Sequence, residues 1–315
     1  MRHTASFHRL GAAMLAGLAA SFIAASGAWA QQASAEYVPR LGQSGKDVMW
    51  LPTADAMMER MLSMAEVTSR DYLVDLGSGD GKIPIAAARG RGTRSLGLEY
   101  NTDLVEVSKR RAREAGVQDK VEFRQADVFA ADFSKASVVT IYLLPELNLR
   151  LRPILFKMKP GTRISSNSFD MQTWLPDETS QMGTARSFLW IIPAHVAGEW
   201  SVSSGSGKQP VATALTLRQR FQKVDGDAQF ERVTASLQDV SLRGTAISFA
   251  TRDANGDKIL FAGTIDGERM TGTATSAKHG RTPFQAERKS KPAPFEEAIA
   301  TEQEKIEAVR ALGAQ

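Results

Sequence analysis

The sequence predicts an α/β protein in which a doubly wound, largely parallel sheet precedes a small antiparallel β domain and a C-terminal helix. Three observations support this prediction. Between residues 72 and 169, short apolar runs alternate with amphipathic stretches, as in strands connected by helices. Residues 196–288 lack helical periodicity and contain Asp-Gly and Asn-Gly turn signals. Residues 291–315 return to an amphipathic helical pattern.

Residues 1–30 predict an export signal. Basic residues that include Arg2 and Arg9 precede an apolar run over 10–25, and the small-x-small sequence at 28–30 is typical of a cleavage site. An uncleaved N-terminal anchor is the alternative, although the apolar run is short for a spanning helix. We therefore expect a periplasmic or membrane-anchored protein. Any association with a membrane would be made by the N-terminal segment.

Composition excludes several classes of site. The chain has no cysteine, which rules out disulfides and thiolate metal ligands. Its net charge of +4 is small and its basic residues are dispersed, so no nucleic-acid partner is expected. Removal of the signal would leave His195 and His279 as the remaining histidines, so we expect no metal site.

A polar lead-in over 31–45 precedes a predicted α/β domain over 46–195. Thr53 is expected to cap a helix over 54–65. The predicted strands cover 72–77, 95–100, 121–127, 136–144, 162–169 and 187–194, and the predicted helices cover 83–89, 103–115 and 147–158. The domain over 196–290 reads as a meander of short strands, including 240–253, 258–266 and 269–276, in a barrel or sandwich. The segment 291–315 holds the C-terminal helix.

The stretch "DLGSGDGK" (75–82) carries the strongest functional signal. It follows an apolar strand, and its three glycines would let a ligand approach the backbone amides of a tight turn. Lys82 occupies the place of the last glycine of the dinucleotide motif G-x-G-x-x-G. Ile83 stands where a phosphate-binding Walker loop needs Ser or Thr.

Two acids after the next strands complete the predicted ligand site. Glu99 ends the second strand, where a carboxylate can accept both hydroxyls of a ribose. Asp127 can accept from an adenine amino group while the amide of Val128 binds a ring nitrogen. Asp75 can hold an ammonium, directly or through water. Since no pyrophosphate-binding feature is evident, the expected ligand is an adenosine without phosphates.

The segments "VDLGSGDGK", "GLEYN", "ADVF" and "YLLPELN" resemble the class I, seven-strand S-adenosyl-L-methionine-dependent methyltransferases, with a Rossmann-like fold, over about 47–169. The resemblance implies that the cofactor is S-adenosyl-L-methionine. The cofactor-binding residues that it implies are Asp75, Gly77, Ser78, Gly79, Gly81, Glu99, Asp127 and Val128.

The segment after the fourth strand indicates which class of methyl acceptor to expect. It lacks the Asn/Asp-Pro-Pro-Tyr/Phe motif of amide- and adenine-directed enzymes. Instead "TIYLLPELNLRLRP" and "MKPGTRISSNSF" resemble the non-SET protein-lysine methyltransferases, with Thr140 departing from the second Asn of the histone-lysine type. "WLPT" (50–53) is similar to the segment that covers the cofactor in the ATP-synthase c-subunit type.

The resemblance implies N-methylation of a protein lysine, with a small-molecule acceptor as an open alternative. Glu146 is the candidate that orients the acceptor amine, and Tyr142 the candidate that lines the transfer channel. Simpler roles are a helix-N-terminal acid for Glu146 and core packing for Tyr142. An exported module that binds an adenosine-type ligand without methyl transfer is the alternative function, because the export signal conflicts with a cytoplasmic methyl donor.

Overall fold

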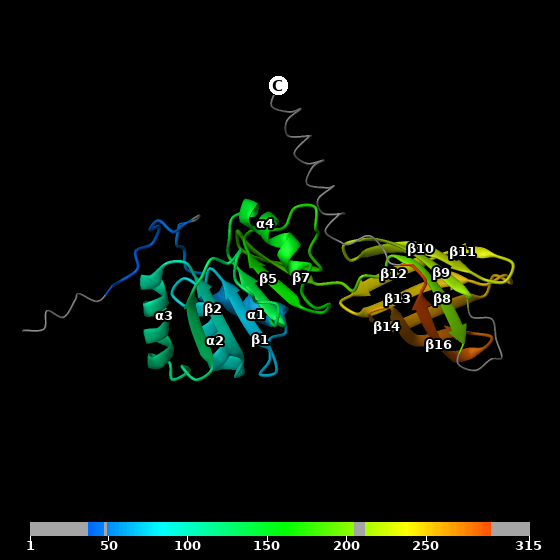
Figure 1. The fold of residues 1–315 in the computed structure, drawn as a ribbon, viewed down its shortest axis with the longest axis horizontal. Helices are drawn as coiled ribbons and strands as arrows, with labels where there is room; N and C mark the ends of the chain where they lie inside the picture. The colour runs from blue at the N-terminus through cyan, green and yellow to red at the C-terminus, as the bar shows by residue number, and fades with distance from the viewer. Residues whose placement is uncertain (1–36, 47–48, 205–211, 291–315) are drawn as a thin grey trace, which may run out of the picture. The chain divides into compact units, whose positions relative to one another are not determined.

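The computed structural model describes residues 37–46, 49–204 and 212–290 (Figure 1). The predicted signal over 1–30, most of the lead-in and the helix predicted within 291–315 lie outside the described residues. The chain divides into two compact units, 1–38 and 39–315. The sheets, the helices and the site described below all belong to the second unit.

The first sheet has seven strands in the order β3-β2-β1-β4-β5-β7-β6. Its strands are β1 (Tyr72–Leu76), β2 (Arg94–Glu99), β3 (Val121–Gln125), β4 (Val138–Ile141), β5 (Arg163–Asn167), β6 (Glu178–Met182) and β7 (Ala185–Ile191). The first five are parallel, whereas β7 runs antiparallel to β5 and β6. The order reverses between β1 and β4, which is the switch point where open α/β sheets bind ligands.

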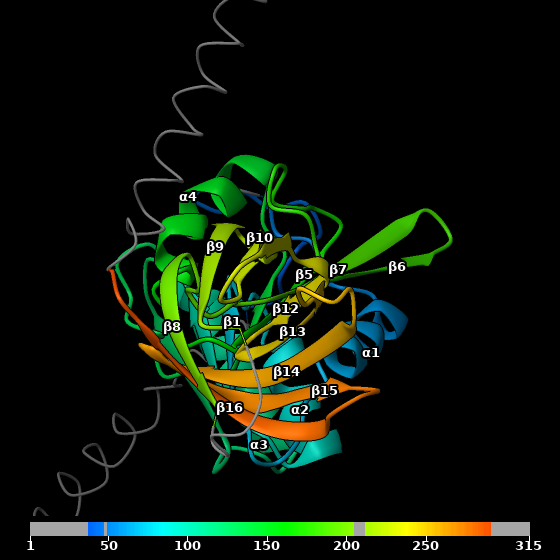
Figure 2. The same ribbon diagram turned by 90° about the vertical axis from the view of Figure 1, so that its right-hand side faces the viewer.

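The helices cover both faces of this sheet. They are α1 (Asp55–Met64), α2 (Lys82–Arg91), α3 (Thr102–Glu114) and α4 (Pro145–Leu155). Figure 2 shows α4 on one side of the sheet and α1, α2 and α3 on the other. The alternation along β1 explains this division, because Leu73 packs with α1 and α2 while Val74 and Leu76 pack with α4.

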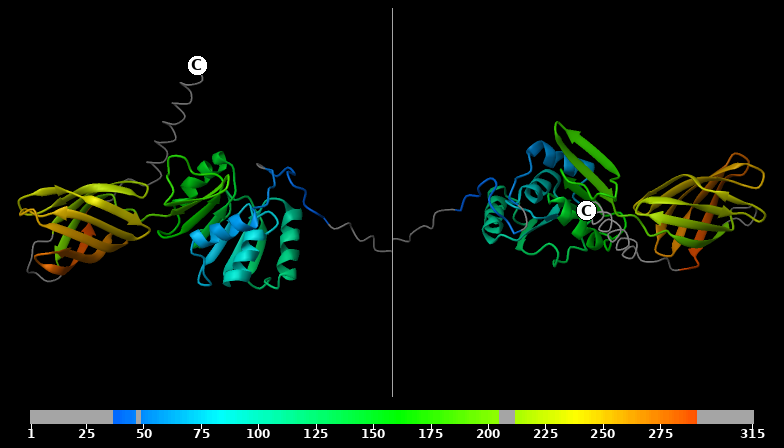
Figure 3. Two further views of the ribbon diagram at one scale, coloured as in Figure 1. Left: turned by 180° about the vertical axis from the view of Figure 1, so that it is seen from behind. Right: turned by 90° about the horizontal axis from the view of Figure 1, so that it is seen from above.

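Four details differ from the sequence prediction. The stretch 240–253, predicted as one strand, forms two antiparallel strands, Gln238–Arg243 and Ala246–Arg252. Thr53 does not cap α1: Ala54 is the N-cap residue without a side-chain hydrogen bond, and Thr53 Oγ1 instead accepts from Asn167 Nδ2 at 3.3 Å. Helix α4 begins at Pro145, two residues before the predicted start, because proline is well suited to a first helical turn. Strand β6 was not predicted, since its polar sequence is half exposed in a hairpin with β7 that extends from the sheet (Figures 2 and 3).

The second sheet has nine antiparallel strands in the order β11-β10-β9-β8-β16-β15-β14-β13-β12. They are β8 (Gly198–Ser204), β9 (Ala214–Arg220), β10 (Lys223–Gln229), β11 (Thr234–Ser236), β12 (Gln238–Arg243), β13 (Ala246–Arg252), β14 (Lys258–Asp266), β15 (Arg269–Ser276) and β16 (Gly280–Arg288). One curled sheet contains all of them, and β10 and β11 near one edge contact β12 and β13 at the other. The sheet is antiparallel throughout, and its interior is packed with large side chains such as Trp200 and Phe261.

Within the described ranges, none of the helices is long and apolar enough to cross a lipid bilayer.

Packing behind the glycine loop gives a stability prediction. A Cβ on Gly97, which is buried in β2, would lie 2.4 Å from the ring of Phe123 and 2.6 Å from Ser78 Oγ. Gly97→Ala should therefore lower the free energy of unfolding by about 1–3 kcal/mol in chemical denaturation. The matched control is Gly90→Ala at the exposed end of α2, where a Cβ meets nothing within 4 Å. That change should add about 0.5 kcal/mol of stability; equal effects of the two changes would contradict the packing argument.

Candidate functional site

A cavity of ≈ 390 Å³ lies at the carboxyl ends of β1 to β4, at the switch point of the first sheet. Its lining comes from the glycine loop after β1, the ends of β2 and β3, the segment after β4 and residues before α1. This volume falls in the usual range for small-molecule sites. Of the residues predicted for the site, the cavity is lined by Asp75, Gly77, Ser78, Gly79, Glu99, Asp127, Val128 and Tyr142.

The glycine loop has a conformation that requires its glycines. Gly77, Gly79 and Gly81 have φ values of 78°, 54° and 79°, in the left-handed region. A Cβ on Gly79 would lie 2.6 Å from Trp50 Nε1, so no side chain fits there. Gly81 does not line the cavity but forms the N-cap of α2.

The amides of this loop bond within the protein, which differs from the expectation that they face a ligand. Gly77 and Ser78 both donate to the carbonyl of Leu98, at 2.8 and 3.0 Å. Gly79 donates to Glu99 Oε2 at 2.9 Å, and Gly81 donates to the carbonyl of Ser78. The glycines therefore permit the close approach of Trp50 at Gly79, and the neighbouring strand supplies most of the acceptors that shape the loop.

Glu99 connects two segments at the end of β2. Its Oε2 accepts from Gly79, and its Oε1 accepts from the amide of Asn101 at 2.9 Å. The Asn101 side chain in turn caps α3 by accepting from the amides of Asp103 and Leu104. The position of Glu99 at the cavity is thus fixed by backbone donors on both sides.

Asp75 is the most deeply buried acid of the cavity, with 4% of its surface exposed. The pKa of Asp75 is raised to about 7, mainly by burial and to a smaller extent by the charges of Glu99 and Asp80, against a hydrogen bond from Thr140 that lowers it. Thr140 Oγ1 donates to Asp75 Oδ1 at 2.6 Å. Thr140, which departs from the histone-lysine pattern, therefore hydrogen-bonds to Asp75 at the start of the glycine loop.

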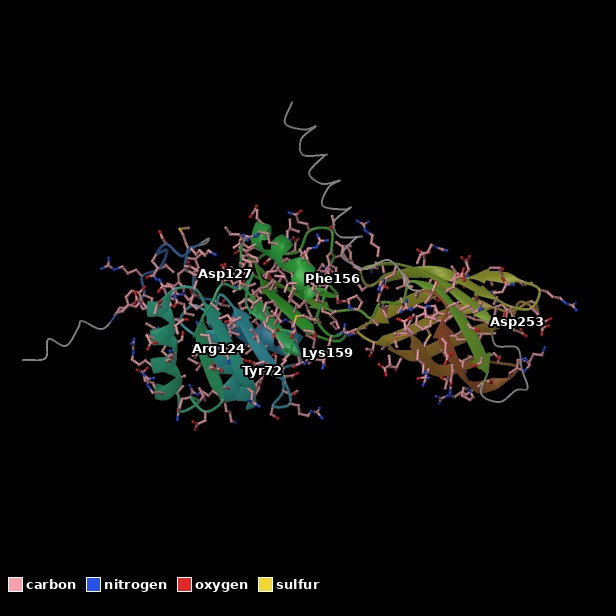
Figure 4. The ribbon with its side chains drawn as sticks, viewed as in Figure 1. Tyr72, Arg124, Asp127, Phe156, Lys159 and Asp253 are labelled. Atoms are coloured by element: carbon pink, nitrogen blue, oxygen red, sulfur yellow. The ribbon has the colours of Figure 1, made fainter. Side chains whose placement is uncertain are left out.

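Asp127 lies at the opposite end of the sheet from Tyr72, which begins β1 (Figure 4). Its Oδ1 accepts from the amide of Phe129 at 3.0 Å. Its Oδ2 forms an ion pair of 2.6 Å with Lys46, whose ammonium also lies 4.9 Å from the centre of the Tyr100 ring. The hydrogen bond from Lys46 lowers the pKa of Asp127. Lys46 therefore occupies one side of the acid predicted to bind adenine.

Residues 42–46 and 49–53, which precede α1, lie over the glycine loop. Gly42 donates to the carbonyl of Trp50 and Trp50 donates to that of Gln43, which folds the segment back on itself. The Trp50 indole lies against Gly79. Lys82 holds the end of the segment, because its ammonium donates to the carbonyl of Thr53 at 2.8 Å and pairs with Asp55 at 2.6 Å. Lys82, which stands in place of the last glycine of the dinucleotide motif, thus fixes the end of the segment before α1.

The two residues predicted for catalysis lie in different environments. Tyr142 is half-buried in the cavity wall and stacks on Phe169, with ring centroids 6.2 Å apart. Glu146 is on the first turn of α4 and is not among the residues that line the cavity. It is exposed to solvent. Its role in orienting an acceptor stays a prediction.

Several cavity residues were missed by sequence reasoning. They include Lys46, Tyr100, Phe129 and Phe169. Tyr100 directly follows Glu99, and Phe129 comes two residues after Asp127, so the aromatic residues just after the strand-end acids were a usable signal. Lys46 and Phe169 reach the cavity only through the tertiary fold.

The cavity fits the predicted cofactor on its own geometry. A cradle at Gly79 that excludes any side chain, a strand-end carboxylate at Glu99 and a buried acid at Asp75 match a glycine-lined ribose and ammonium site. Among the described residues, no group of three acidic or histidine side chains is placed to hold a metal ion.

Comparisons with known proteins point in the same direction. The family model of the ANTKMT methyltransferase domain matches residues 75–178. A protein-lysine N-methyltransferase of Saccharolobus islandicus is 33% identical over 154 residues, which are 47% of this chain and 96% of the relative. A lysine N-methyltransferase of the ATP-synthase c-subunit from Mus musculus is 32% identical over 51% of this chain, and the match spans 62% of that relative's length.

Among solved structures, one described as an RNA methyltransferase from Salinibacter ruber in complex with S-adenosyl-L-homocysteine matches 46% of this chain and 96% of its own. It shows 50% sequence identity and a TM-score of 0.46. Each of these three relatives therefore matches about half of this chain.

The buried acid gives a pH prediction for binding of S-adenosylhomocysteine. A cationic amino group near Asp75 favours the ionised acid, whose pKa in the protein alone is about 7. Below pH 7, binding must therefore release a proton, so the dissociation constant should rise by up to about tenfold per pH unit between pH 7 and 5. Calorimetry over this range measures it.

Two variants control this measurement. Asp75→Asn should flatten the pH profile, because it removes the titrating group. Thr140→Val should move the midpoint to higher pH, since the Thr140 hydrogen bond lowers the pKa of Asp75. An unchanged midpoint in Thr140→Val would show that Asp75 does not set the profile.

Two replacements of Glu99 test its hydrogen bond from Gly79 and its predicted contact with the ribose. Glu99→Ala removes both the acceptor of the Gly79 amide and the predicted ribose ligand, so binding of S-adenosylhomocysteine should fall below detection by calorimetry. Glu99→Gln keeps the shape and one acceptor oxygen, and a loss of about tenfold or more is expected. Wild-type affinity in the alanine variant would remove Glu99 from the site.

Proposed function

Because the chain belongs to the class I S-adenosylmethionine-dependent methyltransferases and resembles their non-SET protein-lysine members, we propose that it N-methylates a lysine of a protein. The observation that supports this most is the 33% identity that extends over 96% of the archaeal protein-lysine N-methyltransferase. S-adenosyl-L-methionine is the cofactor of this family and supplies an activated methyl group on a sulfonium centre. A small-molecule acceptor is the alternative.

The residues of the cavity have distinct parts in this proposal. Asp75 would hold the ammonium of the cofactor, Glu99 its ribose hydroxyls, and Asp127 with Val128 its adenine. Trp50 covers the glycine loop and keeps water from that side. Together they would fix the donor so that its methyl group faces the part of the cavity beside Tyr142.

The part of the cavity beside Tyr142 suits a long side chain with a terminal amine. It is lined by Tyr142, Leu143, Leu144 and Phe169, which are apolar or aromatic. Such surroundings disfavour the charged ammonium, so the acceptor amine loses its proton more easily there than in water. The free lone pair of the amine is what the transfer requires. Glu146, which follows this segment, is proposed to orient the approaching lysine.

The cellular location and the membrane association are proposals that rest on the N-terminal sequence. Residues 1–30 support export or anchoring of the chain. The hypothesis of an exported binding module without methyl transfer is not supported by the comparisons, since the relatives are named as lysine N-methyltransferases. We propose that the β domain over 196–290 selects the protein substrate.

A transfer assay tests the proposed function. The full-length protein is incubated with methyl-labelled S-adenosylmethionine and, separately, with envelope proteins, cytoplasmic proteins and total RNA of the organism that encodes it. Label should appear in protein, and acid hydrolysis should recover it as methylated lysine. Label confined to RNA or to small molecules would contradict the proposal. Glu146→Gln in the same assay should reduce turnover without changing the affinity for S-adenosylhomocysteine.

A further inference from the structure

The turn after β5 places an aromatic ring beside Tyr142 that the sequence did not predict for the site. Phe169 follows β5 and Tyr142 follows β4, which is the neighbouring parallel strand. Their rings stack with centroids 6.2 Å apart and an interplanar angle of 27°. Both side chains are half-buried and both line the cavity. The pair therefore forms a continuous aromatic wall of the cavity.

The backbone of this turn is held in a strained conformation. Ser168 has a φ of 65°, in the left-handed region that non-glycine residues rarely adopt. Its hydroxyl donates to Asn167 Oδ1 at 2.9 Å, and its amide donates to the carbonyl of Arg186 at 2.8 Å. Strain of this kind persists only when surrounding bonds fix it, and it is common where a side chain must be aimed at a ligand.

Helix α4 fixes the position of Phe169 from the other side. Asn148 has no exposed surface, and its Nδ2 donates to the carbonyls of Phe169 and Asp170 at 3.2 Å each. Ser166 Oγ donates to the same Phe169 carbonyl at 2.6 Å. The Phe169 carbonyl therefore accepts two side-chain hydrogen bonds, one from α4 and one from β5. These bonds connect the Phe169 backbone to α4 and β5, while Asn148 Oδ1 is buried without a hydrogen-bond partner among the described residues.

We propose that Phe169 and Tyr142 together form the wall that contacts the acceptor lysine, and that Asn148 is the positioning residue for Phe169. This inference rests on the proposed lysine methylation and names the residues that receive the substrate side chain. The aromatic faces bind the four methylenes of the lysine by apolar contact. They also attract the methylated cation that the reaction leaves, because its charge lies over electron-rich rings.

A binding experiment tests the wall without requiring turnover. The probe is n-butyltrimethylammonium, a copy of a trimethylated lysine side chain, titrated by NMR into the full-length protein saturated with S-adenosylhomocysteine. Phe169→Ala should weaken probe binding about fivefold to tenfold and leave the affinity for S-adenosylhomocysteine unchanged. Phe169→Tyr should bind the probe as wild type does. Probe binding that is absent in the wild type, or unchanged in Phe169→Ala, overturns the inference.

Phe129 supplies a matched control within the same cavity. It lies by Asp127, at the predicted adenine end, and its amide bonds that acid. Phe129→Ala should weaken binding of S-adenosylhomocysteine and leave probe binding at saturating S-adenosylhomocysteine unchanged. If Phe129→Ala and Phe169→Ala reduce probe binding equally, the effect is a general loosening of the cavity and the assignment of Phe169 is wrong.

The positioning role of Asn148 has its own readout. Asn148→Asp keeps the size of the side chain but directs a carboxylate at two carbonyls, so Phe169 should leave its position and probe binding should fall as in Phe169→Ala. Ser166→Ala, which removes only the second bond to Phe169, should give a smaller loss of the same kind. In both variants the Tyr142 ring resonances should shift while the affinity for S-adenosylhomocysteine stays constant. Unshifted Tyr142 resonances would contradict the positioning role.

Turnover separates this inference from the proposed function. With a lysine acceptor, Phe169→Ala should raise KM at least about fivefold and change kcat less. If the wild type methylates no lysine but binds the probe in a Phe169-dependent manner, the aromatic wall stands and lysine methylation fails. If lysine is methylated and KM is the same in Phe169→Ala, the proposed function stands and this inference fails.

Discussion

The hydrogen bonds of Glu99 are the interaction on which the site depends. A loop whose glycines all adopt positive φ has few side chains to pack, so its shape must come from bonds made by neighbouring groups. The carboxylate of Glu99 and the carbonyl of Leu98 accept three successive loop amides, those of Gly77, Ser78 and Gly79. The end of β2 therefore determines the shape of the loop that follows β1. Because Asn101 also donates to Glu99 and caps α3, the same carboxylate joins the loop to the start of that helix.

The electrostatic character of the cavity follows from where its acids lie. Asp75, Glu99 and Asp127 stand at or just after the carboxyl ends of three neighbouring parallel strands, and all three line the cavity. Asp75 responds to this crowding by a raised pKa, to which burial contributes most and the charges of Glu99 and Asp80 add. Asp127 avoids the same effect because it pairs with Lys46, which lowers its pKa. The Asp75 end is therefore where a ligand with positive charge gains the most.

The sequence was sufficient for most of the fold and for bringing the strand-end acids to one cavity, and the reasons are local. Strands β1 to β5 and β7 contain apolar runs, so their existence along the chain could be predicted, whereas their order in the sheet was not. The strand-end acids follow such runs directly. The prediction was wrong where tertiary contacts decide: Thr53 bonds Asn167 in β5 instead of capping α1, and the loop amides bond within the protein instead of facing outward. Lys46 and Phe169 could not be predicted, because their place in the cavity depends on how distant segments fold back.

The hydrogen-bonded loop amides also bear on which ligands would fit the cavity. A phosphate needs free backbone donors or cations, and glycine loops that bind phosphates provide both. Here four loop amides already have acceptors, Lys82 is bound to Thr53 and Asp55, and three carboxylates face the same space. A phosphate placed there would meet negative charge without gaining donors from these four amides, whereas the ammonium and the ribose hydroxyls of a sulfonium nucleoside are donors and would meet carboxylate acceptors. The glycine loop resembles a nucleotide-phosphate site in its spacing. Because its amides already donate to Leu98, Glu99 and Ser78, they are not available to a phosphate, and the cavity is better suited to a cationic nucleoside.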